Sequence, residues 1–481
     1  MGGLPSSDQA AGRYRSERAA YWDRVATGVV RSRGWGKHYH RRLREIYTSL
    51  IPPGSRVLEL GCGQGNLLAA LKPSSGVGVD FCPQMIESAK KLHRELRFEL
   101  ADTHDLELRE TFDYVVLSDL LSDLWDVQTV LERILAACDS RTRIVLNFYS
   151  RVWEPLLATA QRLGFARPTL RGNWLSIHDL ANLLHLANFE VIRSWQEVLF
   201  PLGVPWIEAL CNRFLVRVFP FFHLALTNFV VARPLISPVV GMQPSVSVVI
   251  PARNEAGNIR EIFARMPEMG LEIELVFVEG HSEDQTYETI AAEVAEHPQW
   301  HCTLLRQEGM GKGDAVRQGF AHARGDVLMI LDADLAVAPE ALPRFLEALV
   351  AGKGELVNGV RLVYPMERTA MRFLNLVGNK FFTIAFTWIL GQPIKDALCG
   401  TKVLWRRDYE MLAANRHSLG DFDPFGDFDL IFGCAKLNRK IVDMPVRYRE
   451  RQYGETNIRR WQHGWMLLKM LILGTLKLKF I

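Results

Sequence analysis

The sequence predicts an α/β protein built from two doubly wound domains that follow one another in the chain. Three observations support this fold class. The length of 481 residues exceeds that of one ordinary domain. Short apolar, β-branched runs alternate with helical segments in both halves, which is typical of parallel sheets. Each half also carries a polar motif directly after a predicted strand, at the edge where open α/β sheets bind ligands.

Composition and charge are those of an ordered globular protein. Apolar residues make up 48% of the chain and charged residues 23%. The net charge of +3 is too small to argue for a nucleic-acid partner. The charge is uneven, however, because the first 50 residues hold ten Lys or Arg against four Asp or Glu. This cluster would attract phosphates or an anionic membrane, or it would form a solvated helical face.

Cysteine usage and hydropathy bear on localisation. The seven cysteines are scattered without Cys-x-x-Cys pairs, which favours a reducing cytoplasm. No signal-peptide core and no clean transmembrane helix is predicted. Two apolar segments, residues 381–394 and the lysine-broken tail 461–481, would lie in a membrane interface or pack into the core. We therefore expect a cytoplasmic protein that associates peripherally with the membrane.

The first half of the chain reads as a helical region followed by alternating strands and helices. Residues 13–51 predict helix, which ends at Pro52-Pro53-Gly54. Residues 174–192 predict a helix and then a further strand. Five strands are predicted between these regions, at residues 57–60, 76–80, just before Ala101-Asp102, 112–119 and 143–148.

A glycine-rich turn follows the first of these strands, in the segment RVLELGCGQGNLLAAL at residues 56–71. Glycines allow a backbone to approach a ligand closely where a Cβ would clash. Asp80 ends the next predicted strand, where a carboxylate binds ribose hydroxyls in nucleotide-binding folds. A dinucleotide-binding domain is one interpretation. The pattern more closely resembles class I S-adenosylmethionine-dependent methyltransferases, over roughly residues 55–193, and implies their Rossmann-like fold.

That resemblance implies which residues bind S-adenosylmethionine. The glycine turn would flank the methionine part, Asp80 would hold the ribose and Asp102 would lie near the adenine. His104 and Asp119 would line the acceptor side, or serve structural roles. The cofactor-binding residues implied are Glu59, Gly61, Gly63, Gly65, Asp80 and Asp102.

Between the halves lies a stretch of unusual composition, residues 199–238, which mixes prolines, aromatics and arginines with apolar residues. It would cover a methyl-acceptor pocket or touch lipid. Residues 234–244 are rich in proline and uncharged, so they are predicted to be a linker. The expected domains are therefore residues 1–233 and 245–481.

The second half alternates strands and helices around a pair of acids. Strands are predicted at residues 246–250, 275–278 and 328–331, and a glycine-rich loop at 309–313 leads into a helix. The last of these strands ends in Asp332 and Asp334. Two such carboxylates can hold a hard divalent cation that grips phosphate oxygens. The alternative is a strand end that merely turns through Asp-Ala-Asp.

The order of motifs resembles family 2 glycosyltransferases of the GT-A fold, particularly the dolichyl- or polyprenyl-phosphate sugar transferases, over roughly residues 246–458. The resemblance implies a nucleotide-sugar donor, a polyprenyl-phosphate acceptor at the membrane surface, and Mg²⁺ or Mn²⁺ on Asp332 and Asp334. Together the two resemblances indicate a bifunctional transferase. The alternative is sugar transfer to a hydroxyl in envelope polysaccharide synthesis, with a non-catalytic methyltransferase-like scaffold.

The glycosyltransferase resemblance also implies individual roles. Family members commonly carry an Asp-Asp pair where this chain has Glu279-Gly280. The implied substrate-binding residues are Pro251, Asn254, Glu255, Glu279, Lys312, Asp332, Arg372 and Asp396.

The implied catalytic residues are Asp334, Asp429, Arg361 and Arg451. The arginines would hold the acceptor phosphate, or form surface ion pairs instead. An acceptor phosphate is ionised near neutral pH and needs no strong base. Only a hydroxyl acceptor would require Asp429 or its neighbour Asp427 as a general base.

Overall fold

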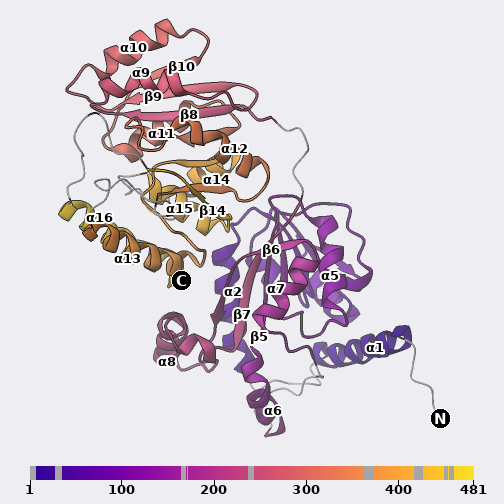
Figure 1. Cartoon of the computed structure of the whole chain (residues 1–481). Coiled ribbons are helices and arrows are strands. Elements are labelled where there is room, and N and C mark those ends of the chain that lie inside the picture. The colour runs from indigo at the N-terminus through magenta and orange to yellow at the C-terminus, as the bar shows by residue number, and fades with distance from the viewer. Residues whose placement is uncertain are drawn as a thin grey trace. The chain divides into compact units, whose positions relative to one another are not determined.

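The chain forms two compact units, residues 1–236 and 237–479, in the computed structural model (Figure 1). Each unit is built on its own seven-stranded sheet, as the predicted fold class requires. The structure describes residues 7–27, 35–163, 170, 172–236, 243–361, 363, 373–416, 426–448, 453 and 460–480.

The N-terminal unit begins with two helices, α1 (Ser7–Ala26) and α2 (Trp35–Leu50). We predicted one helical region over residues 13–51, but the first helix ends at Ala26 and a second begins at Trp35. Residues 28–34, between them, lie outside the described part of the chain. Both helices are polar on average, but only in the second are the apolar residues gathered on one face, which packs Tyr39, Leu43 and Tyr47 into a buried cluster. Only the second helix therefore has an apolar face that contributes to this core.

The first sheet has the order β3-β2-β1-β4-β5-β7-β6, and all five strands predicted in the first half are present. The strands β1 to β5 pair in parallel. Their bounds are β1 (Arg56–Leu60), β2 (Ser75–Asp80), β3 (Arg97–Leu100), β4 (Tyr114–Ser118), β5 (Arg143–Tyr149), β6 (Phe189–Glu197) and β7 (Thr227–Pro234). The longer helices that follow α2 in this unit are α4 (Pro83–Leu92), α5 (Val127–Ile134), α6 (Glu154–Arg162) and α7 (Ile177–Leu186).

The strand β7 corrects the interpretation of residues 199–238. It is buried along its whole length and inserts antiparallel between β5 and β6, so residues 227–234 neither cover a pocket nor touch lipid. Pro234 pairs with Phe189 in this strand, so the predicted linker starts inside the sheet. The segment that precedes β7, residues 199–226, includes the short helix α8 (Pro205–Ala209). It exposes large apolar side chains such as Trp206 and Phe219.

The C-terminal unit has the strand order β10-β9-β8-β11-β13-β12-β14, with β13 antiparallel between β11 and β12. The strands are β8 (Val246–Ala252), β9 (Ile273–Glu279), β10 (His301–Arg306), β11 (Val327–Ile330), β12 (Leu356–Val360), β13 (Lys402–Trp405) and β14 (Ile441–Pro445). The helices are α9 (Ala256–Arg265), α10 (Thr286–Glu296), α11 (Lys312–His322), α12 (Leu342–Val350), α13 (Phe373–Leu390), α14 (Arg406–Asn415), α15 (Asp427–Lys436) and α16 (Arg460–Gly474).

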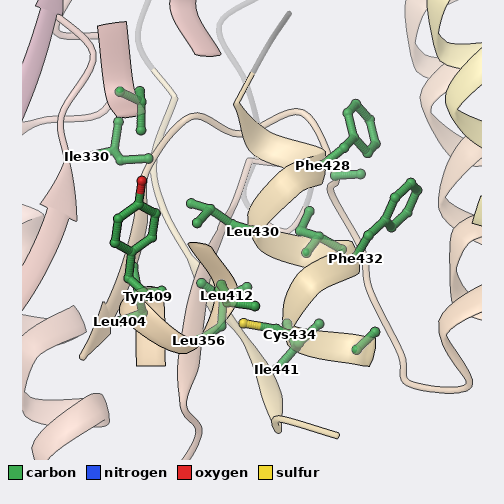
Figure 2. Packing of buried hydrophobic residues seen from close by; sticks show 14 of the residues in the cluster. Ile330, Leu356, Leu404, Tyr409, Leu412, Phe428, Leu430, Phe432, Cys434 and Ile441 are labelled. Carbon is green, nitrogen blue, oxygen red and sulfur yellow. The ribbon is translucent and has the colours of Figure 1, made fainter. Parts of the chain in front are cut away.

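One helix of this unit, α15, is buried in a core beneath the sheet. Its sequence DFDLIFGCAK is apolar on nearly every side after the first turn, which is typical of a helix surrounded by protein. Cys434 extends toward Leu412, whereas Phe428 and Phe432 extend from the other side of the helix (Figure 2) and pack against Phe386 of α13. This packing fixes the first turn of α15, which carries Asp427, relative to the strands.

Candidate functional site

The acidic pair after β11 lies at the carboxyl edge of the second sheet. β11 is flanked by β8 and β13, so its end occupies the middle of that edge. The side chain of Asp332 forms an ion pair with Lys312, at 2.5 Å between Oδ1 and Nζ. Asp334 Oδ1 accepts a hydrogen bond of 3.1 Å from the amide of Ala336. The two carboxylates therefore differ in partners: one faces a lysine and the other stabilises the turn after the strand.

Gly400 explains how Asp332 and Lys312 come so close to the next loop. A Cβ built on Gly400 would lie 2.0 Å from Asp332 Oδ2 and 2.2 Å from Lys312 Nζ. No side chain fits there unless the ion pair moves, so glycine is required by this approach. The segment DALCGTK thus closes one wall of the acidic site.

Arg361 follows β12 and is held by Asp396. Its guanidinium donates two hydrogen bonds to the carboxylate, with Nε at 2.7 Å from Oδ2 and Nη2 at 2.9 Å from Oδ1. Asp396 also accepts from the amides of Arg361 and Leu398. Burial raises the pKa of Asp396, but Arg361 outweighs it and the net shift is downward. Asp396, predicted to bind substrate, therefore positions Arg361, and a role in binding substrate directly stays a prediction.

The structure adds two residues to this site that the sequence did not single out. Lys402, fully buried at the start of β13, donates to Asp427 Oδ1 at 3.0 Å. The sequence feature that could have identified Lys402 is its place at the start of the otherwise apolar strand KVLW. Tyr448 lies with its ring 5.2 Å from the Arg361 guanidinium, and burial, opposed by Arg361 and reinforced by the two acids of the pair, raises its pKa. Nothing in the sequence near Tyr448 marks it.

Charges of both signs are balanced in this site. Burial raises the pKa of Asp332, but Lys312, Lys402 and Arg361 lower it by more. The net shift of the pKa is downward, so the carboxylate stays ionised. Burial lowers the pKa of Lys312, and the acids around it more than compensate. Three cations next to two carboxylates suit a ligand with several phosphate oxygens.

The fit of a divalent metal rests on the donor set of Asp332 and Asp334. Within the described residues no group of three or more His, Cys, Asp or Glu is placed to hold a metal ion. Mg²⁺ usually binds through one or two carboxylates together with water and substrate phosphates, so two carboxylates beside a phosphate site are sufficient. The pair therefore fits such an ion only when phosphate oxygens complete its coordination.

The residues predicted to bind the nucleotide-sugar lie at the ends of β8 and β9. Glu279 Oε1 accepts from the amide of Ser282 at 2.6 Å, and Asn254 accepts from the amide of Glu283 at 2.8 Å. Glu255 is buried and accepts from the Asn258 side chain, while Pro251 lies in β8 itself. These side chains shape the loop after β9, and contact with a nucleoside stays a prediction.

Of three further residues predicted to act in catalysis or substrate binding, the structure describes only Asp429. Its carboxylate forms an ion pair with Arg416, at 2.8 Å between Oδ2 and Nε. Arg372 and Arg451 lie outside the described residues, as do residues 454–457. Their roles stay predictions.

The carboxyl edge of the first sheet holds the glycine turn. Gly61, Gly63 and Gly65 all have positive φ, at 69°, 51° and 73°. The Gly63 amide donates to Asp80 Oδ2 at 2.8 Å, so the carboxylate that ends β2 fixes the turn after β1. A Cβ on Gly63 would meet no atom within 4 Å, which leaves that side of the turn open to a ligand. This cradle fits S-adenosylmethionine.

The two other predicted cofactor residues are also at this edge. Glu59 accepts from the Leu68 amide at 3.0 Å, and burial raises its pKa to about 8 against that hydrogen bond. Asp102 accepts from the His104 amide at 2.9 Å and lies 3.4 Å from Arg15 of α1. His104 thus supports Asp102, which is the structural role that we gave as one of two alternatives, and Arg15 of α1 also reaches Asp102; contact of Asp102 with adenine stays a prediction.

Comparisons with known proteins support both halves. Residues 35–194 match the family described as methyltransferase domain, and residues 247–412 match glycosyl transferase family 2. A dolichol-phosphate mannosyltransferase of Pyrococcus furiosus is 37% identical over 226 residues, which covers 44% of this chain and 59% of that protein. An undecaprenyl-phosphate 4-deoxy-4-formamido-L-arabinose transferase of Edwardsiella ictaluri is 28% identical, covering 44% and 62%.

An undecaprenyl-phosphate mannosyltransferase of Micrococcus luteus is 29% identical over 221 residues, which covers 44% of this chain and 87% of that protein. The chain spans less than two thirds of the length of the first two relatives. Each of the three relatives matches less than half of this chain.

Proposed function

Because the chain contains a methyltransferase domain and a family 2 glycosyltransferase domain, we propose that it is a bifunctional transferase. The C-terminal unit transfers a sugar from a nucleotide-sugar to a polyprenyl phosphate, and the N-terminal unit transfers a methyl group from S-adenosylmethionine. The observation that carries the first activity is the pair Asp332 and Asp334 beside three cations. The names of the relatives support the polyprenyl-phosphate acceptor.

In the proposed sugar transfer, each charged residue of the site has a task. Lys312 neutralises the donor diphosphate, and Arg361, kept rigid by Asp396, orients the acceptor phosphate behind the anomeric carbon. A divalent ion on the acidic pair would stabilise the leaving diphosphate as a Lewis acid. Asp427 and Asp429 are both paired with cations, which favours an ionised phosphate acceptor over a hydroxyl that needs a base.

We place this reaction at a membrane surface because of α13 and α16, which run side by side (Figure 1). On α13, Phe386 and Leu390 are buried, whereas Phe381 is 56% and Ile384 61% exposed. Residues of α16 and the segment after it, among them Trp465, add exposed apolar area. In the described part of the chain, no helix is long and apolar enough to cross a bilayer. Two such faces together would hold the unit in the interface.

Mass spectrometry of lipid products tests the proposed function. The full chain is incubated with detergent-solubilised polyprenyl phosphate and a panel of nucleotide sugars, with and without S-adenosylmethionine and EDTA. We expect a polyprenyl-phosphate sugar that EDTA abolishes. A product formed equally well with EDTA would contradict the metal, and sugar attached only to glycan hydroxyls would contradict the acceptor.

Flotation with anionic vesicles tests the membrane surface separately. The change of Phe381→Asp with Ile384→Asp should reduce flotation and transfer to long-chain acceptors, because charges replace the exposed apolar face. A folded double variant with full activity on membrane-embedded acceptor would exclude this surface.

A further inference from the structure

A buried polar cluster in the N-terminal unit holds the carboxylate of Asp119, directly after β4. The Tyr39 hydroxyl, from α2, donates to Asp119 Oδ1 at 2.8 Å. The Asn147 side chain, from β5, donates to the same oxygen at 2.6 Å. Asn147 is itself oriented by the Tyr47 hydroxyl, which donates to its Oδ1 at 2.8 Å. Two elements, α2 and β5, thus supply the polar groups that fix this carboxylate.

The cluster leaves one carboxylate oxygen available. Among the described residues, no hydrogen bond to Asp119 Oδ2 is formed, and the residue as a whole is only partly buried. The backbone of Asp119 has a φ of 55°, a conformation that non-glycine residues seldom adopt and that is concentrated at functional sites. A buried polar network of this kind is costly unless its groups are paired, so Asp119 Oδ2 needs a partner from solvent or from a ligand.

Asp119 also lies beside the cofactor cradle. β4 pairs with β1, and Leu117 stands opposite Leu60, so the segments after both strands are neighbours. A Cβ on Gly61 would lie 2.8 Å from the side chain of Leu120, which follows Asp119. The glycine turn is where the methionine part of S-adenosylmethionine is expected, and that part carries the methyl group.

We propose that Asp119 is the general base of the methyl transfer, and that the acceptor therefore presents an O–H or N–H group. This inference rests on the proposed methyltransferase function. As the acceptor oxygen or nitrogen bonds to the methyl carbon, its proton passes to Asp119 Oδ2. The carbon–sulfur bond breaks and its electron pair remains on sulfur. Tyr39 and Asn147 are positioning residues that keep the base in place.

The ionisation of Asp119 suits this role. Burial raises its pKa to about 7, the hydrogen bonds from Tyr39 and Asn147 lower it, and the charge of Asp123 raises it. The other titratable groups around it are Tyr39 and Tyr47, whose pKa values burial raises far above their usual range, so both stay neutral. Asn147 and Thr227, on β5 and β7, are uncharged. A base with a pKa near 7 is matched to neutral solution.

Proton release on cofactor binding tests the proposal without knowledge of the acceptor. A sulfonium cation near Asp119 should lower its pKa, whereas S-adenosylhomocysteine, with neutral sulfur, should not. Isothermal titration at pH 7 in buffers of different ionisation enthalpy counts the protons. We expect wild type to release about half a proton more with S-adenosylmethionine than with S-adenosylhomocysteine.

The variants separate the possible outcomes. Asp119→Asn should abolish the difference between the two ligands, whereas Asp113→Asn, at the other end of β4 and paired with Arg56, should keep it. Tyr39→Phe should move the pH at which the difference is half-maximal upward, because it removes a hydrogen bond that favours the carboxylate. If Asp119→Asn binds both ligands and the difference in proton release is undiminished, the assignment of the base is wrong, while the methyltransferase function still stands. Failure to bind either ligand would overturn the methyltransferase function itself.

Methyl transfer gives a second readout. With tritiated S-adenosylmethionine and detergent-solubilised lipid-linked glycans, Asp119→Asn should lower the rate of labelling at least 100-fold while its affinity for S-adenosylmethionine stays within twofold of wild type. Labelling at the wild-type rate would overturn the assignment of the base.

Discussion

The carboxyl edges of the two sheets hold their acids in opposite ways. At the second sheet, the acids are paired with cations: Asp332 with Lys312 and Asp396 with Arg361. At the first sheet, Asp80 and Asp119 are held by neutral donors, the Gly63 amide and the Tyr39 hydroxyl among them. The corresponding edges of the two sheets therefore differ in electrostatics. Cations paired with carboxylates, as at the second edge, can also contact phosphate oxygens, whereas carboxylates held by neutral donors are suited to a sulfonium.

Removing the carboxylate of Asp334 should have the largest effect. Asp334→Ala should lower sugar transfer about 1,000-fold, the scale on which loss of one electrostatic stabiliser of a transition state acts. Product formation by mass spectrometry at saturating Mg²⁺ or Mn²⁺ measures it. Asp326→Asn, at the amino end of the same strand, is the matched control and should keep wild-type activity. Undiminished transfer by Asp334→Ala would rule out its role.

The buried pair of Lys402 and Asp427 should matter for stability. Lys402→Met leaves Asp427 buried without its cation and should lower the free energy of unfolding by about 3 kcal/mol. Lys402→Met combined with Asp427→Asn should recover much of that loss, because no charge is left unpaired. Urea denaturation of the full chain and hydrogen exchange in β13 measure both. If the double variant is no more stable than the single one, the pair is not coupled.

Burial of a carboxylate at the first edge predicts a different dependence of stability on pH. Burial raises the pKa of Glu59 from 4.5 to about 8, so the folded state binds a proton that the unfolded state releases. Its contribution to stability is therefore full below pH 4.5, falls as pH rises to 8 and is constant above that. Glu59→Gln mimics the protonated form and should remove this fall. Denaturation midpoints at pH 5 and pH 9 would show it, and an equal pH dependence in both proteins would contradict it.

How much the sequence predicts differs between local and distant features. The strands that carry the sites were predictable because β-branched runs such as VSVVI end in polar motifs. The strand β7 was not, because Thr227–Pro234 continues an apolar stretch and contains both Arg233 and Pro234. Only its pairing with β5 and β6 makes it a central strand.

The same limit applies to the sites. The sequence identified Asp332, Asp334 and Asp80 from their position after strands. It could not pair Lys402 with Asp427, or Tyr39 with Asp119, because these partners are 25 and 80 residues apart and meet only in the fold. Asp396 was predicted to bind substrate; the structure shows that it holds Arg361, and substrate binding stays a prediction.

One crossed titration tests the comparison of the two edges most directly. The full chain, Asp332→Asn and Asp80→Ala are each titrated with S-adenosylmethionine and with a nucleoside diphosphate in Mg²⁺. Asp80→Ala should weaken S-adenosylmethionine at least tenfold, about 1.4 kcal/mol, and leave the diphosphate unchanged, whereas Asp332→Asn should do the reverse. If either variant weakened both ligands equally, or neither ligand bound the wild-type chain, the account of two independent sites with opposite electrostatics would be wrong.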